Sequence, residues 1–308
     1  MVNLSNFKIA TVCHDAGGAE IVSSLLRRQN IKCKYALFGP ALPIFQRKIE
    51  SIANQTIVDA LYDVDLLICG TSSPSTCELD AIVLAHSQGI KSIAILDHWI
   101  NYRERFLLEN QLITPDEIWV VDETAKQLAS KALPEVNINL IENPYKEDFL
   151  EILTVAQQRH LNNSRRENRK TILYVTEPTS EHAERKYDDP RYWGYTEQEA
   201  VKYFFENITS IAPDVLKVII RPHPSEVLSK YFFALKSQGL EVLITKEREL
   251  VAEIAEADII AGCNSMAMVV GTWAKKNVFC CIPPGGRGFN LPNVGIEFVR
   301  ANVLSRGY

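Results

Sequence analysis

The chain has 308 residues, a hydrophobic fraction of 46% and a formal net charge of −5. This length predicts two domains of similar size, each with an ordinary core. The acidic balance argues against a general nucleic-acid-binding protein, because such proteins normally present a basic face.

The seven cysteines are irregularly spaced and form no CxxC pair. Neither a zinc site nor a disulfide framework is therefore predicted, and a reducing compartment is favoured. The first residues show no signal-peptide pattern, and no run approaches 18 apolar residues. We expect a cytoplasmic protein, with membrane contact limited to a surface patch or a partner.

In the first half, short apolar runs alternate with amphipathic stretches. Runs of four to six residues rich in Ile, Val and Leu are typical of buried strands. Strand-like runs are 8–13, 34–38, 65–69, 91–96 and 117–121, and helix-like runs are 19–29, 43–52, 76–88 and 124–133. This alternation predicts a parallel sheet with helices on both faces.

Residues 145–170 differ from this pattern. A helix is expected at 146–159, followed by the polar stretch HLNNSRRENRK at 160–170, which has no apolar period and is typical of a linker. We place a domain boundary near residue 165, which gives an acceptor-side domain at 1–165 and a nucleotide-sugar-binding domain at 166–308.

The strand–helix pattern then restarts. Strand-like runs are 171–175, 216–221, 241–245, 259–261 and 278–282, and helix-like runs are 196–211, 225–238, 249–256 and 265–275. The predicted fold class is α/β, with two Rossmann-like domains whose parallel sheets face each other across a cleft. In such sheets ligands bind beyond the carboxyl ends of the strands, so the loops after the strands are the candidate sites.

The loop after the first strand carries His14 and Asp15, which are candidate acid–base residues. Gly17, in the following Gly-Gly pair, allows a ligand or another loop to approach the backbone closely. The alternative is that Asp15 simply caps the next helix. A hydroxyl-rich loop at 70–76 either lines a site or caps a helix.

The segment after 91–96 combines polar, aromatic and cationic residues, as carbohydrate pockets do. Its candidates for an acceptor or sugar subsite are Asp97, His98, Trp99 and Arg105. The alternative is a surface loop anchored by one tryptophan.

In the second half, Glu177 follows the strand at 171–175 and precedes a long polar segment, which is either a lid or merely mobile. Arg221 and His223 lie in the RPHPSE loop, where two prolines fix the backbone around the imidazole. A helix is expected to begin at Pro224 or Ser225, so that Arg221 and His223 would bind phosphate beside its N-terminus.

The loop after 259–261 contains Gly262, Asn264 and Ser265 at the start of a helix. This arrangement is typical of a phosphate cradle, and also of ordinary N-caps. The glycine-rich loop at 283–290 either contacts a ligand or is a turn.

The order of strands, helices and loops in the second half resembles the nucleotide-binding half of GT-B glycosyltransferases. More narrowly, it resembles the bacterial sialyltransferases and Kdo transferases that carry an HP motif. This resemblance implies that His223 and Ser265 contact the donor phosphate of a CMP-sugar and that Asp15 activates the acceptor hydroxyl. The family's acidic motif has two adjacent acids before glycine, whereas Ala16 follows Asp15 here.

We therefore predict a glycosyltransferase that moves a sugar from a nucleotide donor, CMP favoured over UDP, to a saccharide or lipid-linked saccharide acceptor in capsule or lipopolysaccharide synthesis. The sequence has no DxD motif, and neither a metal nor another cofactor is expected. Nucleic acid is not an expected partner, peripheral membrane association is left open, and so is the oligomeric state. The alternatives are a non-hydrolysing UDP-sugar 2-epimerase and a non-catalytic sugar-nucleotide-binding protein of polysaccharide assembly.

Overall fold

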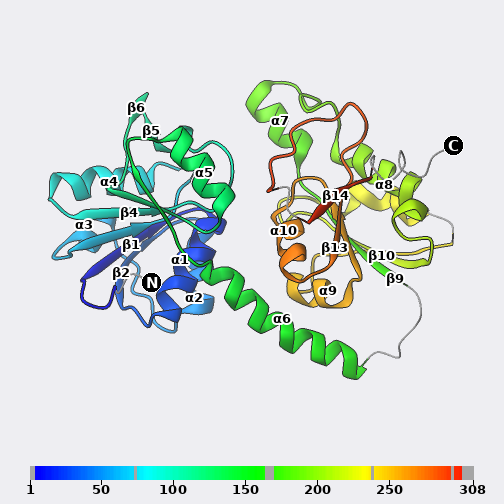
Figure 1. Ribbon diagram of the computed structural model, residues 1–308, viewed down its shortest axis with the longest axis horizontal. Helices are drawn as coiled ribbons and strands as arrows, with labels where there is room; N and C mark the ends of the chain where they lie inside the picture. The colour runs from blue at the N-terminus through cyan, green and yellow to red at the C-terminus, as the bar shows by residue number, and fades with distance from the viewer. Residues whose placement is uncertain (1–3, 73–74, 164–169, 237–238, 293–294, 300–308) are drawn as a thin grey trace. The chain divides into compact units, whose positions relative to one another are not determined.

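The computed structural model describes residues 4–72, 75–163, 170–236, 239–292 and 295–299. The chain divides into two compact units, Met1–Asp148 and Phe149–Tyr308 (Figure 1). The boundary expected near residue 165 lies outside the described residues. No described helix is long and apolar enough to span a bilayer.

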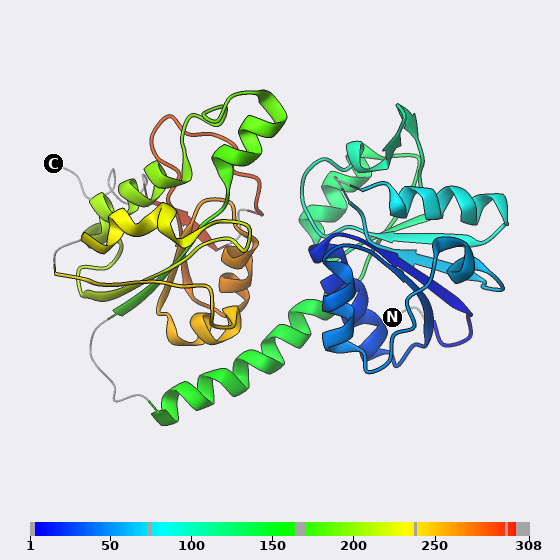
Figure 2. The same cartoon turned by 180° about the vertical axis from the view of Figure 1, so that it is seen from behind.

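The first unit is a six-stranded parallel sheet with the strand order β2-β1-β3-β4-β7-β8. Its elements are β1 (Ile9–Cys13), α1 (Ala16–Arg28), β2 (Cys33–Leu37), α2 (Ala41–Lys48), α3 (Ile57–Leu61), β3 (Leu66–Cys69), α4 (Cys77–Ser87), β4 (Lys91–Ile95), η1 (Glu104–Phe106), β5 (Leu107–Leu108), β6 (Gln111–Leu112), β7 (Glu117–Val120), α5 (Glu123–Ala132) and β8 (Asn137–Leu140). Helices α1 and α2 pack on one face of the sheet, and α4 lies on the other (Figures 1 and 2). Because both faces are covered, strands β1 and β3 are buried throughout.

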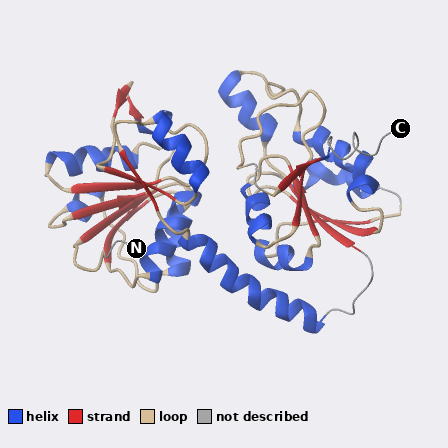
Figure 3. Ribbon diagram, in the orientation of Figure 1, coloured by secondary structure: helices blue, strands red, loops and turns tan. Residues whose placement is uncertain are grey.

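The second unit is also a six-stranded parallel sheet, with the order β11-β10-β9-β12-β13-β14 (Figure 3). Helix α6 (Pro144–Asn163) begins in the first unit and continues into the second. The other elements of the second unit are β9 (Lys170–Val175), α7 (Thr179–Tyr187), α8 (Glu197–Ile211), β10 (Val215–Arg221), η2 (Leu228–Lys236), β11 (Glu241–Ile244), α9 (Leu250–Glu256), β12 (Ile259–Gly262), α10 (Met266–Trp273), β13 (Asn277–Cys280) and β14 (Ile296–Phe298). One core joins the sheet to α6, α9 and α10, and a second core joins its other face to α8 and η2.

The predicted α/β fold with two parallel sheets is confirmed, and the expected strands match to within one or two residues. The edge strand β8, the β5–β6 hairpin and the terminal strand β14 were missed, and so were the helices α3 and α7. Strand β8 has no fully buried residue, so its sequence lacks the continuous apolar run of an interior strand.

Two expectations about helices were wrong. The predicted helix at 225–238 is a 3₁₀ helix, η2, which begins only at Leu228. The turn before it is held by the buried carboxylate of Glu226, which accepts a hydrogen bond from the His223 amide at 3.0 Å. The linker expected from residue 160 begins later, because α6 continues to Asn163.

Candidate functional site

Three of the predicted loops follow neighbouring strands in the second unit. Strand β9 pairs with β10 on one side and with β12 on the other. The loops that carry Glu177, His223 and Ser265 therefore leave the same carboxyl edge of the sheet, where parallel α/β sheets bind ligands. The Thr176 amide donates to the Arg221 carbonyl at 3.1 Å, which joins the first two loops directly.

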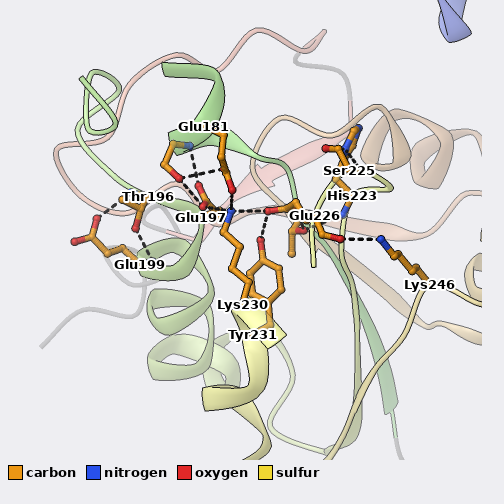
Figure 4. Close-up of polar contacts among 12 residues, drawn as sticks. Glu181, Thr196, Glu197, Glu199, His223, Ser225, Glu226, Lys230, Tyr231 and Lys246 are labelled. Carbon is orange, nitrogen blue, oxygen red and sulfur yellow. Dashed lines mark hydrogen bonds and ion pairs between the residues drawn. The ribbon is translucent and has the colours of Figure 1, made fainter. Parts of the chain in front are cut away.

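The His223 turn is fixed by several side chains (Figure 4). The His223 amide donates to Thr176 Oγ1 at 3.2 Å and to Glu226 Oε2 at 3.0 Å. Lys246 Nζ donates to the carbonyls of Pro224 and Glu226 at 2.9 and 2.7 Å. The imidazole itself is exposed, so the backbone is held rigidly while the ring stays accessible.

The Glu226 carboxylate belongs to a cluster with Glu197, which is also buried, with Lys230 and with the exposed Glu181. Lys230 Nζ lies 2.9 Å from Glu226 and 2.5 Å from Glu181, and it also pairs with Glu197 (Figure 4). Burial alone would lower the pKa of Lys230, but hydrogen bonds to the three carboxylates raise it above its ordinary value. Three carboxylates at this spacing could hold a metal ion. Here the Lys230 ammonium lies among the carboxylates and compensates part of their negative charge.

Glu177 is a half-buried acid at the end of β9. Burial raises its pKa to about 8, and the negative charge of Glu226 adds to the effect. At neutral pH its carboxyl is therefore protonated and does not repel a bound anion.

Ser265 caps helix α10, and its Oγ accepts a hydrogen bond from the Ala267 amide at 3.4 Å. The hydroxyl proton can still be donated to a ligand at this helix N-terminus. Asn264 is placed differently: its amide donates to the Gly288 carbonyl and accepts from the Asn290 amide, so it holds the loop at 283–290 in place. Gly262 is needed for packing, because an added Cβ would lie 2.7 Å from the Val175 carbonyl oxygen.

Arg221 is also engaged within its own unit. Its Nη1 lies 2.7 Å from Glu253 Oε2 and 2.7 Å from the Arg248 carbonyl oxygen. Glu253 is fully buried, so the guanidinium compensates its charge. The predicted phosphate contact of Arg221 remains untested, but this charge is already paired.

In the first unit, His14 and Asp15 form a pair at the start of α1. His14 Nδ1 lies 2.8 Å from Asp15 Oδ1, and the His14 amide donates to Glu78 Oε1 at 2.8 Å. Asp15 occupies the N-cap position, but its side chain makes no capping hydrogen bond. The carboxylate therefore faces the imidazole, as an acid–base pair requires.

Asp97 is buried against the same helix. Its side chain is 3% exposed and lies 3.2 Å from His98 Nε2 and 3.6 Å from Arg105 Nη1. Within the described part of the chain, neither carboxylate oxygen has a hydrogen-bond partner. A Cβ at Gly17 would lie 1.9 Å from Asp97 Oδ2, so the absence of a side chain at Gly17 allows the Asp97 carboxylate to pack against α1.

Two other residues of this segment have structural partners. Trp99 is 9% exposed, and its Nε1 donates to Asp122 Oδ2 at 2.8 Å. This favours the alternative of one anchoring tryptophan over an aromatic face for a sugar. Arg105 Nη1 donates to the Thr71 carbonyl and hydroxyl at 3.2 and 3.1 Å.

Sequence reasoning did not single out Glu226, Lys230 or Glu78 as site-supporting residues. The four-residue spacing of Glu226 and Lys230 was a visible signal of an ion pair. Glu78 gave no such signal, because its partners His14 and Ser72 are fixed by the tertiary structure.

A cavity of about 930 Å³ lies elsewhere in the first unit. It is lined by α1, β7, β8 and the start of α6, and it includes Arg28, Glu117 and Asn137. None of the predicted site residues lines it, so it is separate from the strand-end loops.

Comparisons with known proteins establish the fold. No family model and no curated protein matches the sequence. The UDP-GlcNAc 2-epimerase of Neisseria meningitidis, solved with UDP-GlcNAc bound, is 16% identical with a TM-score of 0.59, covering 97% of this chain and 90% of that one. A putative UDP-N-acetylglucosamine 2-epimerase of Listeria monocytogenes is 11% identical with a TM-score of 0.58, covering 97% and 86%.

The wall teichoic acid polymerase TagF is 10% identical with a TM-score of 0.50, covering 94% of this chain and 76% of that one. These structural neighbours are enzymes with a two-domain, GT-B-like fold. At such low identity the similarity shows the fold that this chain shares with them.

Proposed function

We propose that this protein is a glycosyltransferase that binds the phosphate of a nucleotide-sugar at the carboxyl edge of its second sheet. The observation that carries the proposal is the placement of His223 and Ser265 at the ends of strands separated only by β9. The imidazole N–H and the serine hydroxyl would donate to the phosphate, and the N-terminus of α10 would favour its charge. Protonated Glu177 would add no repulsion.

In the proposed reaction, the His14–Asp15 pair supplies the base. Asp15 takes the proton from the acceptor hydroxyl, and the acceptor oxygen forms a bond to the anomeric carbon of the donor. The bond from that carbon to the phosphate oxygen breaks, and the charge left on the phosphate is stabilised by His223 and Ser265. In this proposal His223 and Ser265 stabilise the negative charge of the leaving phosphate, and no metal ion is required.

The finer assignment is a CMP-sugar donor and a saccharide or lipid-linked saccharide acceptor, in cytoplasmic assembly of capsule or lipopolysaccharide. It rests on the HP motif at His223-Pro224 and on Ser265. The fold shared with a polymer-forming enzyme is compatible with this class of reaction.

A second candidate is a UDP-sugar 2-epimerase. This reaction needs several acid–base groups and no acceptor, and three titratable side chains, His14, Asp15 and Asp97, gather at the start of α1. The solved 2-epimerases also share the fold over most of both chains.

Two experiments test these assignments. In a thermal-shift panel with CMP, CDP, UDP and GDP, CMP is expected to give the largest shift. A ligand at about 100 times its dissociation constant stabilises by about 2.7 kcal/mol. His223→Gln and Ser265→Ala should reduce the shift, while His86→Gln, an exposed histidine on α4, should not. The donor site is wrong if no nucleotide stabilises the protein.

The reaction is then tested by incubation with UDP-GlcNAc alone, and with CMP-sugars plus saccharide acceptors. Conversion of UDP-GlcNAc without acceptor assigns the epimerase, and acceptor-dependent CMP release assigns the transferase. Asp15→Asn should abolish transfer while nucleotide binding stays near that of the wild type. Binding with no turnover of either substrate would identify a non-catalytic binding protein.

A further inference from the structure

The imidazole of His223 is contacted by Ser225, the residue two positions later in the chain. Its Nδ1 lies 3.2 Å from the Ser225 amide nitrogen and 2.7 Å from Ser225 Oγ (Figure 4). A backbone amide can only donate a hydrogen bond, so Nδ1 is the acceptor and carries no proton. The ring proton is then on Nε2.

We infer that Ser225 is a positioning residue that holds His223 as the neutral Nε2–H tautomer, so that the site recognises a phosphate oxygen with an uncharged donor. The ligand part of this inference rests on the proposed function. The tautomer itself does not, because it follows from contacts within the free protein.

The surrounding turn keeps Ser225 close to the ring. Pro222 and Pro224 fix the backbone φ on either side of His223. The buried carboxylate of Glu226 holds the His223 amide, and that carboxylate is itself held by Lys230 and by Tyr231 Oη at 2.6 Å. The position of the serine relative to the imidazole is therefore set by buried groups rather than by an exposed loop.

The burial of the ring also favours its neutral form. Partial burial lowers the pKa of His223, and the nearby His182 and Lys246 lower it further. Glu226, which is paired with Lys230, acts in the opposite direction, but the net shift is downward. An uncharged imidazole is the form in which one nitrogen accepts while the other donates.

The test is ¹⁵N NMR of histidine side chains in the ligand-free full chain, with His223→Gln used to assign the His223 signals. At pH 7 we expect a protonated Nε2 and an unprotonated Nδ1, with a titration midpoint below the ordinary value. Ser225→Ala removes the hydroxyl contact to Nδ1 but keeps the backbone amide, so the titration midpoint should rise while Nε2–H remains the main tautomer. Ser225→Thr should restore the wild-type pattern, and Ser229→Ala, at an exposed position in η2, should leave it unchanged.

A Nδ1–H signature in the wild type, or an unchanged spectrum in Ser225→Ala, overturns the inference. The wild-type spectrum decides the tautomer even if a variant fails to fold. In a parallel CMP titration, Ser225→Ala should bind about two- to tenfold more weakly, as loss of one ordinary hydrogen bond predicts, and Ser225→Thr should recover the affinity. The expected tautomer without CMP binding supports the role of Ser225 and contradicts the CMP donor site.

Discussion

Glu177 shows how one buried acid links the chemistry of the site to the stability of the protein. Its pKa is raised to about 8 by burial and by Glu226. Between about pH 4.5 and 8 the folded protein therefore keeps a proton that the unfolded chain has lost. Binding of that proton favours folding, and the contribution is lost as the pH rises through this window.

We predict that Glu177→Gln becomes more stable relative to the wild type as the pH rises from 5 to 8. The glutamine cannot ionise, so the variant avoids the free-energy cost of a buried negative charge that the wild type incurs at high pH. Urea unfolding at pH 5, 7 and 9 measures the difference, and Glu184→Gln, at an exposed position in α7, is the control. The same difference at pH 5 and at pH 9 would contradict the assignment.

Gly17 gives a second prediction at this scale. Alanine normally stabilises a helix by up to about 1 kcal/mol relative to glycine. At this position the new Cβ would collide with Asp97 Oδ2, so we expect Gly17→Ala to destabilise by about 1–3 kcal/mol.

A double-mutant cycle tests the cause of this effect. In an Asp97→Ala background the collision is removed, so Gly17→Ala should become neutral or stabilising. An equal cost in both backgrounds would show that Asp97 does not lie against this glycine.

At the scale of elements, the cluster around Lys230 holds the site together. Glu181 comes from α7, Glu197 from α8 and Lys230 from η2, and Glu226 lies in the turn that carries His223. The lysine therefore joins three helices to the candidate phosphate-binding turn through one ammonium group. Removing it leaves buried carboxylates without compensation, which is far more costly than losing a surface ion pair.

We predict that Lys230→Met destabilises the protein by about 3–5 kcal/mol. Lys236→Met, an exposed position in the same 3₁₀ helix, should change stability by less than about 0.5 kcal/mol. The variant exposes three carboxylates to a cation, so Ca²⁺ should raise its melting temperature but not that of the wild type. Equal effects of the two substitutions would show that the cluster does not support the fold.

At the scale of the whole molecule, helix α6 contributes to the core of the second unit. Phe149 and Leu153 are buried in that core, and the Phe149 ring lies 6.3 Å from that of Trp273 in an edge-on contact. A fragment that starts after α6 would lose these side chains, and truncation of a buried phenylalanine to alanine alone costs about 3–5 kcal/mol.

We therefore expect a fragment of residues 144–308 to be more stable than one of residues 166–308. Both fragments contain the candidate donor loops, so both should bind CMP if they fold. Thermal unfolding followed by circular dichroism compares them, and Phe149→Ala in the longer fragment isolates the aromatic contact. Equal stability of the two fragments would show that α6 does not stabilise the second unit.

The elements were largely predictable, and the partners of the side chains were not. Interior strands such as β3 and β9 are continuous apolar runs, so their positions follow from local hydrophobicity. The edge strand β8 escaped because it is only partly buried. The expected helix after Pro224 is instead a 3₁₀ helix that begins at Leu228, and the Glu226 carboxylate before it is bonded to Thr176, which lies 50 residues away in the sequence.

The sequence by itself determined the α/β fold with two parallel sheets, and it located the loops that follow each strand. The physical reason is that burial on both sheet faces imposes a pattern of apolar runs that local sequence records. Only the tertiary structure decided how the residues of these loops are used. It paired Arg221 with Glu253 and Trp99 with Asp122, and it fixed the His223 ring over Ser225. Such pairs depend on which elements pack together, so no local pattern can specify them.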